Sequence, residues 1–429
     1  FGDIMKGFNR LFALLLSLTL LPLAAQQTFD ARGTGMAFSN SADTRGLEQT
    51  GLNPATLALH YRAGFEFNFV SLNASVYNNS LNKGLYDQYF TTGDTLQSAD
   101  KENLLNHIPG SGLQSDVLGR INTFGFYLPN FSLTVAGVGA SRVNLPREVA
   151  ELALYGNNEL GRVYDFSNVA GDAWGGMVVS AGLAIPFRYG QDSFLEMLAV
   201  GITGKYISGL AYFEVTDAQG SFTNPTATDT YIDLDGELTA RTARGGSGMA
   251  FDLGLVAQTS EKFTLSATLL NGFGRVNWQA DTEIRQYTVS GQDLAIGSDG
   301  FEDSLIVDTD TTYATGAFTT HLPVVLDLGL AYKPFRRLTL TANMEQGFTE
   351  EMGGYKGTRV ATGLEFTGIP LLPLRAGASF GGRFGNSYAF GTGLYLKILY
   401  VDLAVMSHGG FSAGSSQGLT LAATTRLSF

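Results

Sequence analysis

The chain has 429 residues, a net charge of −12 and no cysteine, which excludes disulfide or thiolate chemistry and disfavours binding to nucleic acid phosphates. Hydrophobic residues make up 44% of the chain, yet beyond residue 25 no apolar run reaches the roughly 20 residues of a transmembrane helix. The 54 glycines and the 12% of aromatic residues favour tightly turned strands over long helices.

The amino terminus predicts export. An uninterrupted apolar run over 11–23 is preceded by two basic residues and followed by two alanines: Lys6, Arg10, Ala24 and Ala25. This order is typical of a secretory signal peptide, which we place at 1–25, and the run is short for a membrane anchor. Residues 1–4 precede Met5, and we interpret them as an artefact of gene calling.

Alternation of apolar and polar residues predicts an all-β fold, a transmembrane antiparallel β-barrel of about 14 strands that occupies 61–429. An even number of strands returns both chain ends to the same side of the membrane. The predicted strands are 61–76, 113–128, 131–144, 173–187, 194–212, 248–258, 262–275, 323–333, 338–348, 356–367, 372–384, 386–396, 399–408 and 417–429.

The connections alternate between short turns, expected on the periplasmic side, and long polar loops, expected outside the cell. Residues 229–244 and 281–290 have strand character within two of the long loops. We predict that both are extensions above the membrane, because adding either one alone to the wall would break the up-and-down order.

Two strands illustrate the pattern. In 338–345 the polar set ends on Glu345, so we expect this carboxylate to face the lumen. In 61–76 the apolar residues change parity between Phe69 and Val70, which indicates a β-bulge. The change is either an ordinary rim bulge or a kink of the kind that opens lateral exits in fatty-acid-transporter barrels.

The carboxyl-terminal strand 417–429 has one apolar face and ends on an aromatic residue. We assign Leu427 and Phe429 to a carboxyl-terminal assembly signal. This implies the barrel assembly machinery as a partner, together with outer-membrane lipid and lipopolysaccharide, and a place in the outer membrane of a Gram-negative bacterium.

The glycine-rich stretch 31–57 leads to Asn53-Pro54-Ala55. This segment resembles the amino terminus of FadL-type outer-membrane proteins, which carry Asn-Pro-Ala in a hatch folded inside a fourteen-stranded barrel. The resemblance implies a hatch over 26–60, with Asn53, Pro54 and Ala55 as its motif, and passage of hydrophobic small molecules. The alternative is a surface turn that starts the first strand.

A second resemblance lies further along the chain. Residues 248–255 with 265–278, which end on Trp278, are similar to a hairpin in an uncharacterised FadL-like family.

Enzyme motifs are weak, and we predict no enzyme, no cofactor and no metal site. Gly-x-Ser-x-Gly occurs at 377–381 and 410–414, but a nucleophile elbow needs a strand-turn-helix context that neither segment predicts. The four histidines lack zinc-binding spacing, and we interpret His408 as an exposed rim residue. Acidic clusters at 233–237 and 299–310 are expected to be solvated loop charge, or to bridge divalent cations to lipopolysaccharide.

Short helices are expected within the external loops at 98–106, with Ser98 as the cap, and at 146–154, beginning with Pro146.

The leading functional hypothesis is an outer-membrane channel for passive transport of hydrophobic small molecules. The alternative is an outer-membrane scaffold that binds a surface or secretion partner through the long loops 213–247 and 276–322. A third possibility is a soluble secreted β-sandwich.

Overall fold

The computed structural model describes residues 30–61, 63–93, 95–156, 159–189, 193–224, 231–260, 262–295 and 307–429. The predicted signal peptide and the acidic residues 299–304 lie outside the described residues.

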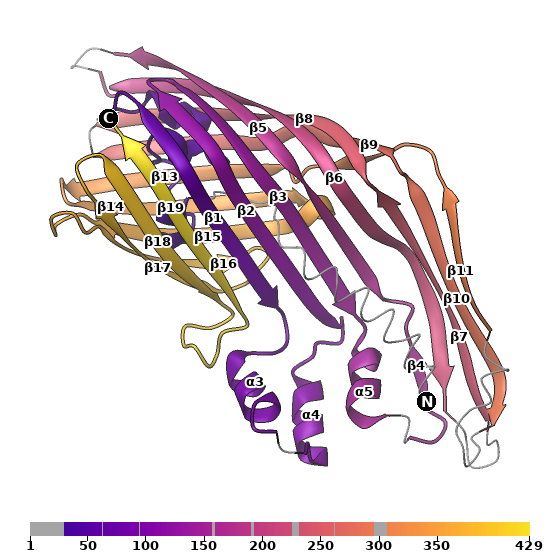
Figure 1. The fold of residues 1–429 in the computed structure, drawn as a ribbon. Helices are drawn as coiled ribbons and strands as arrows, with labels where there is room; N and C mark the ends of the chain where they lie inside the picture. The colour runs from indigo at the N-terminus through magenta and orange to yellow at the C-terminus, as the bar shows by residue number, and fades with distance from the viewer. Residues whose placement is uncertain are drawn as a thin grey trace.

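The described chain forms one continuous antiparallel sheet that closes on itself (Figure 1). Among the described residues the sheet has nineteen strands, five of which lie outside the ring, so that fourteen form the wall. Closure comes from β1, which pairs with β19 on one side and β2 on the other. The predicted fourteen-stranded barrel is therefore confirmed, and the two-sheet sandwich is excluded.

The wall strands match the alternating segments of the sequence, and β2 coincides with its predicted range. In ring order they are β1 (Glu66–Asn78), β2 (Leu113–Leu128), β3 (Phe131–Leu145), β5 (Ala170–Arg188), β6 (Met197–Thr223), β8 (Gly245–Ser260), β9 (Phe263–Ala280), β13 (Val325–Phe335), β14 (Leu338–Thr349), β15 (Tyr355–Phe366), β16 (Leu374–Gly381), β17 (Ser387–Tyr395), β18 (Leu399–His408) and β19 (Gly418–Ser428).

The remaining strands extend the sheet beyond the ring: β4 (Val163–Asp165), β7 (Tyr231–Ala243), β10 (Glu283–Ala295), β11 (Val307–Ala314) and β12 (Phe318–His321). β7 pairs with the far half of β6 and with β10, which pairs in turn with β11. The segments 229–244 and 281–290, which correspond to β7 and β10, are thus extensions of the sheet beyond the wall, as predicted. The sequence underestimated β6, which continues into the extension instead of ending near 212.

Helices are short: α2 (Ala31–Gly35), α3 (Lys83–Phe90), α4 (Ser98–Asn106), α5 (Arg147–Tyr155), and the 3-10 turns η1 (Gly46–Gln49), η2 (Pro54–Ala58) and η4 (Glu351–Gly353). Figure 1 shows α3, α4 and α5 side by side at the end of the ring opposite the carboxyl terminus. The prediction of Ser98 as the helix cap is wrong: Gln97 is the cap, and its N–H donates to Asp100 at 2.9 Å. Within the described residues, no helix is both long and apolar enough to cross a membrane.

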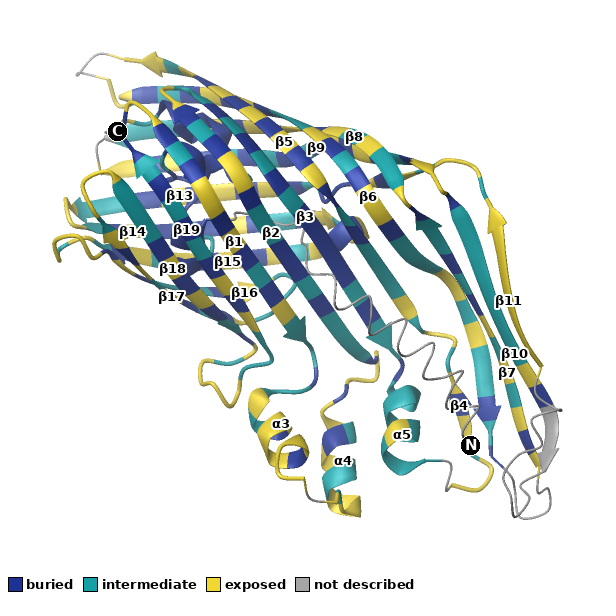
Figure 2. Cartoon of the chain, viewed as in Figure 1, coloured by how far each residue is buried: buried dark blue, intermediate teal, exposed yellow. Residues whose placement is uncertain are grey.

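Burial alternates along the wall strands, as the striped ribbons of Figure 2 show. In β14, Leu340 and Met344 are exposed, whereas Thr341 and Glu345 are buried. The outer face of the ring is therefore apolar and the inner face polar, the arrangement of a barrel whose outside meets lipid. The predicted inward direction of Glu345 is confirmed.

The predicted bulge in β1 is present. Its register with β19 shifts between Asn68 and Val70, and Phe69 and Val70 are both exposed on the outer face. The extra residue restores the apolar set of the second half of the strand to the outside.

The amino-terminal segment 30–59 is almost entirely buried. It contacts inward-facing residues of strands from different sides of the ring: Ala31 N donates to Thr424 of β19, Asn343 of β14 donates to Ser41, and Gln49 donates to Ser132 of β3. A segment that contacts the inner faces of such widely separated strands lies on the inside of the ring.

Candidate functional site

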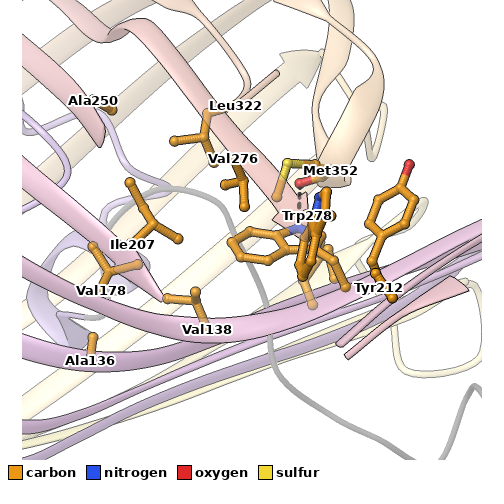
Figure 3. Close-up of a cluster of buried hydrophobic side chains, with 14 residues drawn as sticks. Ala136, Val138, Val178, Ile207, Tyr212, Ala250, Val276, Trp278, Leu322 and Met352 are labelled. Carbon is orange, nitrogen blue, oxygen red and sulfur yellow. Dashed lines mark hydrogen bonds between the residues drawn. The ribbon is translucent and has the colours of Figure 1, made fainter. Parts of the chain in front are cut away.

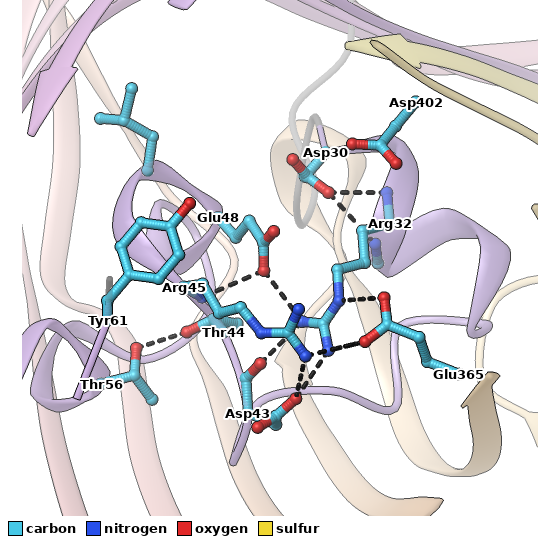
Figure 4. Close-up of polar contacts among 12 residues, drawn as sticks. Asp30, Arg32, Asp43, Thr44, Arg45, Glu48, Thr56, Tyr61, Glu365 and Asp402 are labelled. Atoms are coloured by element: carbon cyan, nitrogen blue, oxygen red, sulfur yellow. Dashed lines mark hydrogen bonds and ion pairs between the residues drawn. The ribbon is translucent and has the colours of Figure 1, made fainter. Parts of the chain in front are cut away.

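An ion-pair network ties the amino-terminal segment to the barrel wall (Figure 4). Arg32, in α2, is fully buried and contacts three carboxylates. It donates from Nε and Nη2 to Glu365 of β15, each at 2.9 Å, from Nη2 to Asp43 at 2.6 Å, and from Nη1 to Glu48 at 2.9 Å. The Asp30 side chain accepts from the backbone nitrogens of Arg32 and Gly33 and caps α2. The short helix thus positions this guanidinium.

Two wall arginines extend the network. Arg375 contacts Glu365 at 3.0 Å and Asp402 at 2.6 Å. Arg426 contacts Glu48 at 3.0 Å and Asp402 at 3.2 Å, so it joins β18 and β19 to η1.

Charges balance within the described part of the network. Its five cations are Arg32, Arg45, Lys333, Arg375 and Arg426, and its five carboxylates are Asp30, Asp43, Glu48, Glu365 and Asp402. In a buried setting such pairing offsets the cost of desolvating each charge.

This pairing determines the direction in which the pKa values of two carboxyl groups in the amino-terminal segment are shifted. Burial by itself raises the pKa of the Asp43 carboxyl, but the charges of Arg45, Arg32 and Lys333 overcome this and hold the pKa well below its ordinary value. Glu48 is also buried, and Arg32 holds its pKa below the usual range. Both carboxylates are therefore ionised partners that hold the segment in place.

The Asn-Pro-Ala motif lies inside the ring. Asn53 caps η2 by accepting from Ala55 N at 2.9 Å, and its amide donates to the Leu255 carbonyl of β8 at 3.1 Å. Two wall glycines make room for the motif: a Cβ at Gly201 would lie 2.3 Å from Ala55 N, and one at Gly254 would lie 2.1 Å from Asn53 Oδ1. The motif therefore approaches the wall too closely for a larger residue at either glycine.

The interior also contains an apolar cluster. Trp278 of β9 is fully buried and packs with Tyr212, Leu322 and Met352 (Figure 3). Its indole donates to Thr320 at 3.0 Å. Met352, in the turn η4, lies within this cluster, so this turn packs against the interior of the barrel.

The wall is interrupted beside this cluster. β9 pairs first with β13 and then with β12, and between these two ladders residues 271–274 face residues 322–324. We call these two stretches the wall gap. In this described stretch one backbone bond crosses the gap, from Leu322 N to Gly274 O at 3.0 Å. Asn271 and Phe273 both have positive φ, near +54°, which breaks the regular strand.

Side chains close the wall gap from within. Asn271 donates from Nδ2 to the Pro323 carbonyl at 2.8 Å and accepts from Lys205 Nζ at 2.7 Å. Its backbone N–H donates to Asp252 at 2.8 Å, and Asp252 pairs with Lys205 at 2.7 Å. One asparagine therefore connects the gap to an interior ion pair.

Hollows lie on both sides of the wall gap. On the inside is a small cavity of about 60 Å³, lined by Gly51, Lys205, Asn271 and Leu322, among others. On the outside is a groove of about 1110 Å³, lined by residues that include Phe273 and Val324. We call these the inner cavity and the outer groove.

Several predicted site residues lie away from this arrangement. His408 is fully buried, hydrogen-bonded to Ser387 at 2.8 Å and to Thr420 at 2.7 Å, so its interpretation as an exposed rim residue is wrong. It faces inward because it shares the inward parity of Asp402, Ala404 and Met406 in β18. Ser379, in the first Gly-x-Ser-x-Gly match, is buried in the wall strand β16. Within the described ranges, no three His, Cys, Asp or Glu side chains form a group able to hold a metal ion.

Both residues of the proposed assembly signal lie at the end of the last strand. Leu427 pairs with Phe67 of β1, and Phe429 is exposed with its ring centroid 6.1 Å from that of Phe65.

A match to a family model shows which protein family the chain belongs to. The model described as "Family of unknown function (DUF5723)" matches residues 54–245 and 233–405. The chain belongs to this family. No curated protein matches this member of DUF5723.

Solved structures match the DUF5723 fold over nearly its whole length. The Pseudomonas putida toluene transporter TodX is 13% identical, with a TM-score of 0.52 over 94% of this chain and 99% of TodX. A Pseudomonas aeruginosa FadL homologue is 11% identical, with a TM-score of 0.50 over 95% of this chain and 100% of the homologue. The resemblance to FadL-type barrels seen in the sequence is confirmed at the level of the fold.

Sequence reasoning missed the ion-pair network and the wall gap. The network joins residues hundreds of positions apart, and no local pattern pairs them. The gap has a weak local signal, since Gly272 and Gly274 interrupt an otherwise regular strand, and glycines within a strand often mark a bulge.

Proposed function

We propose that the chain is an outer-membrane channel that passes hydrophobic small molecules by diffusion between the barrel interior and the membrane-facing surface at the wall gap. The observation that carries this proposal is the placement of the inner cavity and the outer groove on the two sides of the same gap. Asn271 lines the cavity, and Phe273, two residues further along β9, lines the groove, so the same short stretch of the wall gap borders both hollows.

Passage requires the wall gap to move. A cavity of about 60 Å³ is smaller than the roughly 150 Å³ that holds a benzene ring. Opening costs less here than in a regular ladder, because one backbone bond and the contacts of Asn271 take the place of that ladder. Displacement of 322–324 would join the cavity to the groove.

The amino-terminal segment has the role of a hatch in this proposal. The hatch spans 26–60, and its described part, 30–60, is held by the ion-pair network and by Asn53, Pro54 and Ala55 against β6 and β8. Residues 1–25 serve as the signal peptide, and Leu427 and Phe429 as the assembly signal. The similar solved structures, among them a toluene transporter, support a channel over the scaffold that the long loops suggested.

A disulfide lock tests the proposal. The chain has no cysteine, and a Cβ at Gly274 would lie 2.9 Å from the Leu322 Cβ and 2.8 Å from the Asn271 carbonyl oxygen. A disulfide needs a Cβ separation of roughly 3.5–4.5 Å, so the bond forms after a small outward shift of residue 274. We would express Gly274→Cys/Leu322→Cys in Gram-negative cells and follow entry of the apolar dye N-phenylnaphthylamine. We expect oxidation to slow entry several-fold and a reductant to restore it, with both single variants unaffected by either reagent.

Two outcomes contradict the proposal. If wild-type protein, shown to be folded in the membrane, admits no more dye than cells without it, the chain is not such a channel. If the oxidised pair admits dye as fast as the reduced pair, molecules do not pass at the wall gap.

A further inference from the structure

The outer groove is bounded by a row of outward-facing residues from four neighbouring strands. Direct cross-strand pairing places Tyr206 beside Met249, Met249 beside Arg275, and Arg275 beside His321. All four side chains are exposed and line the groove. An aromatic, a thioether, a guanidinium and an imidazole thus lie side by side on the outer face.

On the opposite side of the groove, Phe348 of β14 pairs directly with Lys356 of β15. Both are exposed and line the same hollow. Each side of the groove therefore presents one apolar surface and at least one cationic group.

Polarity changes along the wall at the level of Arg275. Towards the short turns, the next outward residues are Phe251 and Phe273, the latter 92% exposed. Towards the long loops, they are Ser247 and Asn277. Arg275 therefore lies at the boundary between the apolar band and the polar end of the wall, the level at which lipid headgroups meet acyl chains.

Within the described chain, some charged side chains around the groove have an ion-pair partner and others do not. Glu351 is already engaged, since it accepts from His321 N at 2.8 Å and lies 3.5 Å from His321 Nδ1. Glu350 lies 4.0 Å from Lys356. Arg275, by contrast, has no ion-pair partner among the residues that the structure describes. An exposed guanidinium above an aromatic surface is suited to a bidentate phosphate contact.

We propose that the outer groove is a binding site for a phosphate-bearing membrane lipid. The phosphate contacts Arg275 and, across the groove, Lys356, while an acyl chain lies over Met249, Phe251 and Phe273. The lipid is a resident of the membrane and is separate from any transported molecule. The site would keep the outer side of the wall gap covered by one ordered lipid.

Binding of phosphatidylglycerol tests this site. Delipidated full-length protein in detergent would be mixed with phosphatidylglycerol, or with diacylglycerol of the same chains, and lipid adducts counted by native mass spectrometry. We expect phosphatidylglycerol to bind well above diacylglycerol, and Arg275→Gln together with Lys356→Gln to weaken it roughly tenfold or more. The matched control is Arg336→Gln, an exposed arginine at a short turn of the same barrel.

The proposal is overturned if the double variant binds phosphatidylglycerol like wild type, if diacylglycerol binds equally well, or if Arg336→Gln weakens binding as much. The readout is lipid retention and not flux, so this site and the proposed channel succeed or fail separately.

Discussion

Arg32 and Glu365, which are 333 residues apart in the chain, form two side-chain hydrogen bonds of 2.9 Å with both side chains buried. The first comes from the amino-terminal segment and the second from the inner face of β15. This paired contact joins the amino-terminal segment directly to the wall, and it predicts how firmly the segment is held.

Replacing Arg32 by methionine should strongly destabilise the packing of the amino-terminal segment in the barrel. It leaves Glu365, Asp43 and Glu48 with an uncompensated buried charge, for which we expect a loss of about 3–5 kcal/mol. The measurement is equilibrium unfolding in detergent, together with limited proteolysis of the amino-terminal segment. Lys83→Met, which removes an exposed pair with Asp87, should cost less than about 1 kcal/mol. Equal losses for the two variants would contradict a structural role for the network.

Acid should release part of this stabilisation. The pKa of Asp43 and that of Glu48 are lower in the folded protein than in the unfolded chain, so both contribute stability at neutral pH. That contribution begins to fall as the pH drops below about 4 and is lost as it passes the folded pKa. Unfolding measured between pH 7 and pH 3 should therefore show a smaller loss for Asp43→Asn than for wild type. Parallel curves for the two proteins would count against this account.

Gly201→Ala should displace the Asn-Pro-Ala motif. The new Cβ would lie 2.3 Å from Ala55 N and 2.4 Å from the Pro54 carbonyl carbon, which are backbone atoms and cannot turn aside. We expect a cost of about 1–3 kcal/mol and faster hydrogen exchange over 54–58. Gly204→Ala, on the same strand, is the matched control, because its Cβ would meet no atom within 4 Å. Unchanged exchange in Gly201→Ala would show that the motif does not pack against β6.

Asn271→Asp should loosen the wall gap. Aspartate keeps the side-chain shape, tolerates the positive φ and still accepts from Lys205, but it has no donor for the Pro323 carbonyl. We expect faster hydrogen exchange over 322–325 and faster dye entry. Asn277→Asp, on the same strand at the edge of the outer groove, should leave both measurements unchanged. Slower entry, or exchange like that of wild type, would mean that this asparagine does not hold the gap closed.

Much of the fold was predictable because the barrel imposes a local rule. Each wall strand has one face towards lipid and one towards a polar interior, so period-two alternation is present within every strand. The bulge at Phe69 was visible for the same reason, since an extra residue changes the parity of the apolar set. The inward direction of Glu345 followed from parity alone.

The errors occurred where contacts between distant segments decide the outcome. His408 was misjudged because its burial depends on Ser387 and Thr420, which neighbouring strands bring to it. The helix α3 was not predicted. It packs through Leu85 and Tyr89 against Leu104 of α4, so tertiary contacts support it more than its own sequence does.

By itself, the sequence determined that this chain is a closed barrel, because alternation specifies which face of each strand meets lipid and an even strand count closes the ring. Only the tertiary structure decided what the interior contains and where the wall is interrupted. Buried charges such as Arg32 and Glu365 must find partners wherever the fold provides them, and the gap at Asn271 exists because β9 changes partners from β13 to β12. Neither depends on the spacing of residues within one strand.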